Sequence, residues 1–171
     1  MLCSSPDPAW NDAILALMDE AFEGGFQPED WDHALGGVHA IAFRGETICA
    51  HASVVHRTLW VAGRPLRCGY VEAVAVLPPL QGQGLGTAVM QALEPTIRRY
   101  ELGALSTGEH HFYARLGWER WRGRTWVRSG TRLIRTEEED DGVMVLRTPS
   151  TPPAMSLESY IACESRPGDA W

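Results

Sequence analysis

The sequence predicts a single α/β domain over residues 1–171, in which helices cover both faces of a sheet. Three observations indicate this class. The chain has 171 residues and 44% of them are apolar, which suits one compact core. Helix-start signals are followed by runs with strand-like composition. One of these runs, residues 69–76, is apolar on both faces, as is typical of a strand in the middle of a covered sheet.

Two helices are predicted before the first long strand. Asp7 followed by Pro8 is typical of a helix N-terminus, because aspartate caps the first amides and proline needs no N–H there. This helix is expected to run to the glycine pair that begins at Gly24. Pro28 starts a second, short helix, which the glycine pair at Gly36 ends.

Three strands follow, separated by turn-forming residues. They are predicted at residues 38–43, 47–60 and 69–76. The first strand of the fold is expected before Asp7, where only a short segment is available.

Glu72 is the one charged residue in the third of these strands. A carboxylate there must be hydrogen-bonded, paired with an arginine, or placed at a cleft, because desolvating it alone is costly. From burial alone a structural ion pair is favoured over a catalytic role, and both interpretations stay open.

A glycine-rich turn and a helix follow that strand. The glycines let the backbone approach an anion, and the first amides of the helix point toward it, which is typical of a phosphate site. Glycines at 82, 84 and 86 do not fit Gly-x-Gly-x-x-Gly or a P-loop, which excludes those nucleotide sites. Alternatively, the glycines only make a tight connection. Pro95 predicts a kink or local break in the helix.

The charge balance is acidic, with 22 Asp plus Glu against 15 Lys plus Arg and a formal net charge of -7. It argues against binding along a nucleic-acid backbone and is compatible either with a cationic ligand or with ordinary solubility. Arginines concentrate in residues 98–136 and acidic residues in 137–171. The acidic run 137–141 is usually interpreted as a solvated loop. However, Gly142 and a strand at 143–146 follow it directly, and a carboxylate held at the start of a strand can point into a cleft.

The four cysteines are scattered and give no zinc pattern, so we expect no metal and a reduced chain. No targeting segment or membrane span is found in the sequence, and we expect a cytoplasmic protein with no membrane or nucleic-acid partner.

Two motifs carry a resemblance to a known family. Gln81-x-x-Gly84-x-Gly86 resembles the pyrophosphate loop of the GCN5-related N-acetyltransferases (GNAT), and residues 112–118 resemble the Phe-Tyr-x-x-x-Gly-aromatic segment of the same superfamily. Three further stretches resemble the aminoglycoside 2'-N-acetyltransferases within it. These are residues 30–37, residues 68–76, and Asp140-Asp141-Gly142 together with the tail 166–171.

The resemblance implies a GNAT fold, with a mixed, mostly antiparallel sheet splayed at an acetyl-CoA site. It also implies direct acetyl transfer, in a ternary complex, from acetyl-CoA to the 2'-amino group of an aminoglycoside, with CoA as product. The residues implied for acetyl-CoA are Val74, Ala75, Val76, Gln81, Gly82, Gln83, Gly84, Leu85 and Gly86.

For catalysis the resemblance implies Glu72 as base, acting through a water, and Tyr113 as the acid that protonates the thiolate. The residues implied for the cationic substrate are Glu72, Ala73, Ser106, Asp140, Asp169 and Trp171, the last through its terminal carboxylate. Without the family, Tyr113 would be an aromatic that anchors a short helix and Asp169 a turn residue.

The family also implies a homodimer. Gly25 stands where relatives carry an acidic substrate contact, so the substrate range is expected to differ. Two alternatives stay open. The first is a GNAT enzyme for another small cytosolic amine. The second is a non-catalytic acetyl-CoA-binding module, which should lack the base and the acid that are present here. A nucleic-acid role for the arginine-rich segment is disfavoured, because arginines near a CoA 3'-phosphate or in surface ion pairs explain it.

Overall fold

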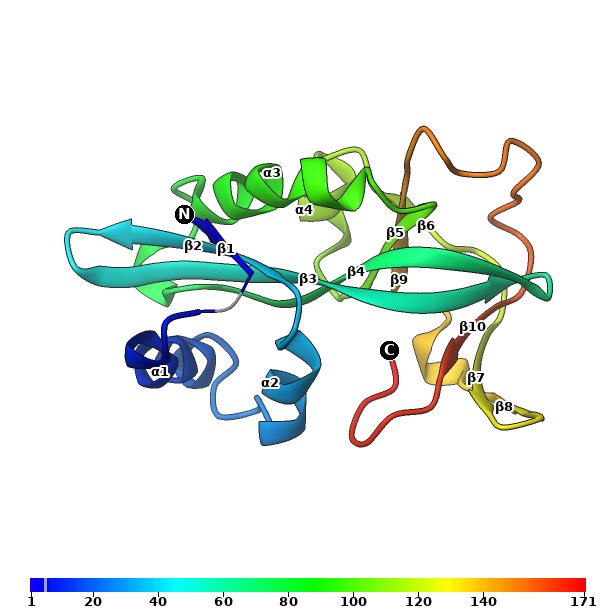
Figure 1. Cartoon of the computed structure of the whole chain (residues 1–171), viewed down its shortest axis with the longest axis horizontal. Helices are drawn as coiled ribbons and strands as arrows, with labels where there is room; N and C mark the ends of the chain where they lie inside the picture. The colour runs from blue at the N-terminus through cyan, green and yellow to red at the C-terminus, as the bar shows by residue number, and fades with distance from the viewer. Residues whose placement is uncertain (5) are drawn as a thin grey trace. The chain divides into compact units, whose positions relative to one another are not determined.

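The computed structural model describes residues 1–4 and 6–171. The chain divides into two compact units. Unit 1 comprises Met1–Val55 and Val71–Thr96, and unit 2 comprises His56–Tyr70 and Ile97–Trp171. The two long strands, β3 (Thr47–Val61) and β4 (Arg64–Val76), contribute residues to both units (Figure 1).

The helices of unit 1 begin where the sequence predicted. The carboxylate of Asp7 accepts a hydrogen bond from the Ala9 amide at 2.9 Å and caps a 3-10 turn, Pro8–Trp10, that leads into α1 (Asn11–Ala21). α2 (Pro28–Ala34) begins with a capping box, in which the Gln27 amide donates to the Asp30 carboxylate at 2.9 Å.

The strands of unit 1 form an antiparallel arrangement. β1 (Leu2–Cys3) pairs with β2 (Val38–Arg44), and β2 pairs with β3. The first strand is therefore short, as expected. The turn between β2 and β3 contains Gly45, whose φ of 61° lies in the left-handed region that favours glycine.

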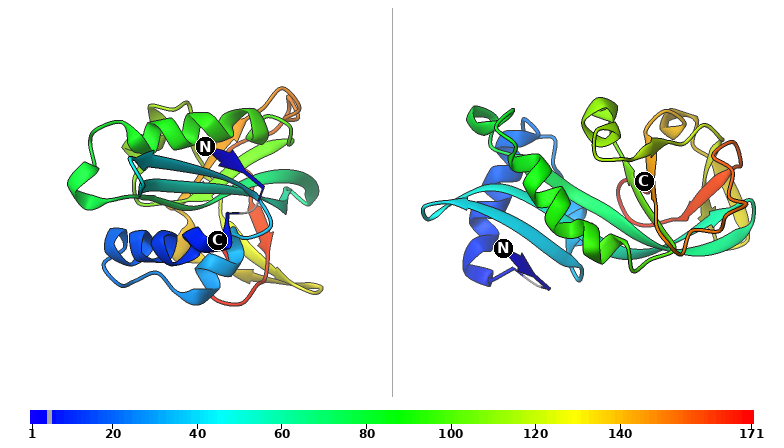
Figure 2. Two further views of the ribbon diagram at one scale, coloured as in Figure 1. Left: turned by 60° about the vertical axis from the view of Figure 1, so that its left-hand side comes forward. Right: turned by 90° about the horizontal axis from the view of Figure 1, so that it is seen from above.

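Helices cover both faces of this part of the sheet, as the apolar strand predicted. α1 and α2 lie on one face, and α3 (Leu85–Ile97) lies on the other (Figures 1 and 2). α3 continues through Pro95, so the break expected there is not found. Only two residues follow Pro95 in the helix, so the hydrogen bond that proline cannot make falls in the last turn. The core under α1 and α2 contains Ile14, Leu17, Met18, Trp31, Ala34, Ile41, Ile48 and Ala75.

Unit 2 contains β5 (Leu102–Ser106), α4 (His110–Ala114), β6 (Glu119–Arg120), β7 (Thr125–Ser129), β8 (Arg132–Arg135), β9 (Val143–Arg147) and β10 (Ile161–Glu164). Together with β3 and β4, these strands have the order β6-β9-β5-β4-β3-β10-β7-β8. β5 runs parallel to β4 and β10 parallel to β7, whereas β5–β9, β6–β9, β7–β8 and β3–β10 are antiparallel. The expected mixed, mostly antiparallel sheet is confirmed. Two further 3-10 turns are Pro78–Leu80, after β4, and Glu137–Glu139, between β8 and β9.

The largest fully buried side chain of the described residues is Trp121 in unit 2, which is 1% exposed and donates its indole N–H to the Ser159 carbonyl at 2.9 Å. The backbone of Gly123 lies against the same carbonyl, and a Cβ at this position would lie 1.8 Å from it. Gly123 therefore permits this close backbone approach. Within the described residues, no helix is long and apolar enough to cross a membrane.

Candidate functional site

The middle of β4 departs from regular strand geometry at Ala73. Its φ is 51°, a left-handed conformation that costs a non-glycine residue about 1–3 kcal/mol. Two side chains of β3 hold the carbonyls at this point. His51 Nδ1 lies 2.8 Å from the Ala73 carbonyl, and Ser53 Oγ donates to the Glu72 carbonyl at 3.3 Å. Glu72 itself is half-buried.

The glycine-rich loop after β4 is exposed and tied back by glutamines. The Gln81 side-chain amide donates to the Val76 carbonyl at 3.3 Å, and that of Gln83 donates to the Pro79 carbonyl at 3.2 Å. Gly82 and Gly84 have φ of 73° and 85°, and nothing lies within 4 Å of a Cβ built on either. Because the first amides of α3 have no acceptor within the helix, this loop can receive an anion.

Tyr113 lies in α4 of unit 2, where it is 6% exposed and packs edge-on against Trp118 with ring centroids 6.0 Å apart. Burial, with a smaller contribution from the charge of Glu109, raises the pKa of Tyr113 well above its ordinary value. The phenol therefore stays protonated near neutral pH, the state that a proton donor requires.

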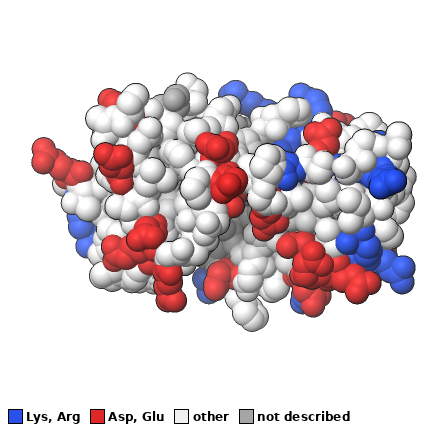
Figure 3. Space-filling view, turned by 90° about the horizontal axis from the view of Figure 1, so that it is seen from below, with Lys and Arg blue, Asp and Glu red and all other residues white. Residues whose placement is uncertain are grey.

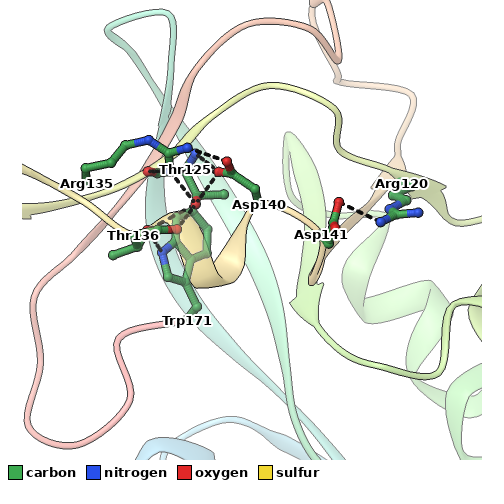
Figure 4. Close-up of polar contacts among 7 residues, drawn as sticks. All are labelled: Arg120, Thr125, Arg135, Thr136, Asp140, Asp141 and Trp171. Carbon is green, nitrogen blue, oxygen red and sulfur yellow. Dashed lines mark hydrogen bonds and ion pairs between the residues drawn. The ribbon is translucent and has the colours of Figure 1, made fainter.

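Asp140 is the centre of a polar cluster in unit 2 (Figure 4). Its Oδ1 accepts from Arg135 at 2.7 Å and from both the amide and the hydroxyl of Thr125 at 2.9 Å, and its Oδ2 accepts from the other Arg135 nitrogen. The hydrogen bonds from Arg135 are the largest cause that lowers the pKa of Asp140 to about 2. Asp141 pairs instead with Arg120 at 2.7 Å. Asp140 is therefore held by specific partners next to the strand that follows Gly142, whereas the Asp141 side chain remains 86% exposed, as expected for a solvated loop.

Ser106 meets a carboxylate that the sequence analysis did not single out. Its hydroxyl donates to Glu139 Oε2 at 2.9 Å. Burial raises the pKa of Glu139, and the nearby charge of Asp169 raises it further. Gly142 permits this contact, because a Cβ there would lie 2.7 Å from Ser106 Oγ. The signal was only the acidic run itself, since nothing in it distinguishes position 139 from its neighbours.

The C-terminal tail is pinned, as its proposed role requires. Trp171 is 4% exposed, and its indole donates to Thr136 Oγ1 at 3.2 Å. Its amide donates to the Asp169 carboxylate at 3.0 Å, and Arg166 donates to its backbone oxygen at 3.1 Å. Arg57 donates to the Ala170 carbonyl at 2.7 Å. Two arginines thus hold the tail through its backbone oxygens.

The predicted site residues fall into two groups, one in each unit. In unit 1, β4 and the loop after it contain Glu72, Ala73, Val74, Ala75, Val76, Gln81, Gly82, Gln83, Gly84, Leu85 and Gly86. Unit 2 contains Ser106, Tyr113, Asp140, Asp169 and Trp171. On the face drawn in Figure 3, acidic side chains (red) lie in several separate groups, some of them beside arginines (blue).

Residues 7–118 match the model of the acetyltransferase (GNAT) family, which covers more than half of the chain and includes both β4 and the glycine-rich loop. The chain belongs to the GNAT family of acetyltransferases. This membership confirms the resemblance carried by the Gln81 to Gly86 loop and by the segment that contains Tyr113.

The chain is 43% identical to an aminoglycoside 2'-N-acetyltransferase from Mycolicibacterium fortuitum, over 98% of this chain and 88% of that one. The narrower resemblance is thereby confirmed as well. A GNAT family N-acetyltransferase from Escherichia coli, solved with CoA, has a TM-score of 0.68 at 15% identity over 95% of this chain and 88% of its own. A GCN5-related N-acetyltransferase from Kribbella flavida has a TM-score of 0.59 at 23% identity over 72% of this chain, which spans only 33% of that longer protein. These structures share the GNAT fold with this chain.

Proposed function

We propose that this protein transfers an acetyl group from acetyl-CoA to the 2'-amino group of aminoglycosides. The observation that carries the proposal is the 43% identity, over 98% of the chain, to an aminoglycoside 2'-N-acetyltransferase. We further propose that residues 1–171 act as one acetyltransferase domain, in the cytoplasm and as a homodimer. Light scattering on the purified protein tests the last point, and a single monomeric mass across a wide concentration range would contradict it.

Acetyl-CoA suits the residues of unit 1. The extended segment from Val74 to Val76 offers backbone groups to the amides of a pantetheine arm. The exposed amides between Gly82 and Gly86 suit its pyrophosphate, and the positive φ of Gly82 and Gly84 sets the shape of that loop. The E. coli relative, which binds CoA, shares this fold.

The amine must lose a proton before it attacks the thioester, because an ammonium group has no lone pair. Glu72 is the proposed base and takes this proton through a water. The Val74 amide is the proposed donor to the acetyl carbonyl oxygen, where negative charge develops as the carbon–nitrogen bond forms. The left-handed conformation at Ala73 lies between these two groups and sets the direction of each.

The carbon–sulfur bond then breaks, and the departing thiolate needs a proton. Tyr113 is the proposed donor, in the protonated state that its raised pKa maintains at neutral pH. The attacking nitrogen loses a second proton to solvent as the tetrahedral intermediate collapses. After one turnover Glu72 has gained a proton and Tyr113 has lost one, exchange with solvent restores both groups, and the net reaction releases one proton. No acyl-enzyme is required, and transfer is direct.

Carboxylates are proposed to bind the ammonium groups of the substrate. Glu72, Asp140, Asp169 and the chain end at Trp171 are carried over from the family, with Ser106 and the Ala73 backbone as further contacts. We add Glu139, which is half-buried and whose pKa is raised by burial and by the charges of Asp169 and Glu138; it forms no ion pair among the described residues.

A second candidate is acetylation of a small amine that carries fewer positive charges. The pairing of Asp140 with Arg135 favours it, since that arginine cancels one charge on which a polycation would depend. Gly25 removes another expected carboxylate.

The test is thiol release from acetyl-CoA, measured for a panel of amines. Matched aminoglycosides that carry either a 2'-amino or a 2'-hydroxyl group, such as kanamycin B and kanamycin A, isolate the position of transfer. We expect turnover only with the 2'-amino member, and a product acetylated at that nitrogen by NMR. Equal turnover of both members would overturn the regiochemistry, and turnover restricted to small monoamines would favour the second candidate.

The variant Glu72→Gln tests the proposed base, because it keeps the size of the side chain and removes the carboxylate. We expect it to lower kcat while acetyl-CoA still binds, as measured by calorimetry. Unchanged kcat would remove Glu72 from the mechanism.

A further inference from the structure

Two fully buried histidines of unit 1 are linked to the backbone of β4. His39 on β2 and His51 on β3 are both 0% exposed, and His39 Nδ1 lies 3.0 Å from His51 Nε2. The ring of Trp31 in α2 packs against both, with centroids 6.0 Å from His39 and 5.6 Å from His51. The pair is therefore shielded from solvent and continues to the backbone of β4 through the 2.8 Å contact with Ala73.

The proton positions in the hydrogen-bonded series His39–His51–Ala73 follow from its last member, the Ala73 carbonyl. A carbonyl only accepts hydrogen bonds, so the proton of a neutral His51 sits on Nδ1 and is donated to Ala73. The Nε2 atom of His51 is then an acceptor, and His39 must carry its own proton on Nδ1 to donate to it. His39 Nε2 is left as a buried acceptor for which no partner is recorded among the described residues. Burial lowers the pKa of His51 to about 4 and also lowers that of His39, so both rings are neutral near pH 7.

The carbonyl at the end of this hydrogen-bonded series belongs to Ala73, the residue of β4 with the strained backbone. Ala73, at φ of 51°, separates Glu72 from Val74. Ser53, two residues beyond His51 on the same side of β3, holds the preceding carbonyl of Glu72 at 3.3 Å. Two consecutive carbonyls of β4 thus receive donors from β3 side chains, and a change at either would let the backbone between Glu72 and Val74 relax.

We propose that His51, locked in one tautomer by His39, is a positioning residue for acetyl transfer. It holds the Ala73 carbonyl and so fixes the directions of the Glu72 side chain and the Val74 amide. This inference rests on the roles proposed for those two groups. His51 itself touches neither substrate nor acetyl group.

The kinetic test uses three variants of the full chain. His51→Leu keeps an apolar side chain of similar size and removes the donor. His51→Asn returns an N–H donor near the position of Nδ1. Cys49→Ala is the control, because Cys49 is 1% exposed on the same strand and its thiol, within the described residues, hydrogen-bonds to the Thr47 carbonyl, at 3.4 Å, and not to β4.

We expect His51→Leu to lower kcat about ten- to hundredfold, the effect of a reacting group displaced by a fraction of an ångström to about 1 Å. The KM for acetyl-CoA should change less than about threefold, because the glycine-rich loop is untouched. His51→Asn should recover part of the lost kcat, and Cys49→Ala should lower the melting temperature with kcat unchanged. Any of three results would overturn the proposal. They are a wild-type kcat in His51→Leu, a kcat in His51→Asn no higher than in His51→Leu, and a kcat in Cys49→Ala as low as in His51→Leu.

A second readout does not depend on the substrate. In long-range proton–nitrogen spectra of the histidine-labelled protein at neutral pH, His51 and His39 should both carry their proton on Nδ1. A proton on Nε2 of His51, or a charged ring, would overturn the inference. If the wild-type protein acetylates no aminoglycoside, the proposed function fails. The spectrum still tests whether His39 holds His51 in the tautomer that carries its proton on Nδ1.

Discussion

Arg135 and Asp140 form a two-point ion pair, in which each terminal guanidinium nitrogen donates to a different carboxylate oxygen. Paired in this way, Asp140 contributes to the stability of unit 2 as well as offering a candidate substrate contact. Because the pKa of Asp140 is depressed to about 2 in the folded protein, its stabilising effect is present above the unfolded-state pKa of about 4. The effect is lost as pH falls through the folded-state value.

Asp140→Asn should therefore lower the melting temperature at pH 7. The expected decrease is about 2–4 °C, which corresponds to a loss of about 1 kcal/mol in a chain of this size. The difference from wild type should shrink as pH falls from about 4 to about 2. Thermal unfolding followed by circular dichroism checks both points. Asp141→Asn is the control, because Asp141 and its partner Arg120 have side chains 86% and 48% exposed, and a shift below about 1 °C is expected. Equal shifts in both variants would contradict the assignment.

Glu139→Gln should raise the KM for an aminoglycoside about tenfold near neutral pH, the loss of one ammonium contact worth about 1.4 kcal/mol. The KM for acetyl-CoA should not change. Because the pKa of Glu139 is raised, its charge is lost earlier as pH falls, and the two proteins should converge under mildly acidic conditions. Initial-rate kinetics across pH checks this. Glu138→Gln removes the neighbouring, exposed carboxylate, and an equal rise in KM there would point to general attraction of a polycation.

Tyr113→Phe should lower kcat by about a hundredfold, the contribution typical of a positioned general acid. Binding of acetyl-CoA should persist, since the phenyl ring keeps the packing against Trp118. Single-turnover thiol release measures the chemical step directly. Tyr100→Phe is the control, because Tyr100 stacks on His56 at 5.7 Å and carries no proposed catalytic role. A wild-type rate in Tyr113→Phe would assign the proton to water.

Gly84→Ala should raise the KM for acetyl-CoA several-fold. The φ of 85° disfavours an L side chain by about 1 kcal/mol, and the loop can relieve that strain only by turning its amides away. Calorimetric titration with CoA measures the effect. Gly45→Ala places the same kind of strain, at φ of 61°, in the turn between β2 and β3. We expect it to change stability alone, and weakened CoA binding there would show that the effect is not specific to the loop.

Features that depend on near neighbours in the sequence were predictable. The Asp7 cap acts two residues along the chain, and the glycine-rich loop is a local turn between a strand and a helix. The pairing of Asp140 with Arg135 spans only five residues, yet the sequence did not indicate it, because the acidic run and the arginine-rich segment looked like separate surfaces.

Contacts over long separations were not predictable. Glu139 meets Ser106 across 33 positions, and His51 reaches Ala73 across 22. Both depend on the register in which distant segments pack, which a hydrophobic pattern alone does not specify. The positive φ of Ala73 had no signal either, since alanine is not a residue that usually marks a left-handed position.

The hydroxyl of Thr125 joins Asp140 to the chain end, because Thr136 Oγ1 donates to it at 3.0 Å and accepts from the Trp171 indole at 3.2 Å (Figure 4). Residues that share such a network do not respond independently to mutation. Changes at positions 140 and 171 should therefore be epistatic, and a replacement tolerated at one depends on the amino acid at the other. Directed evolution of substrate range in this protein would have to vary the two positions together.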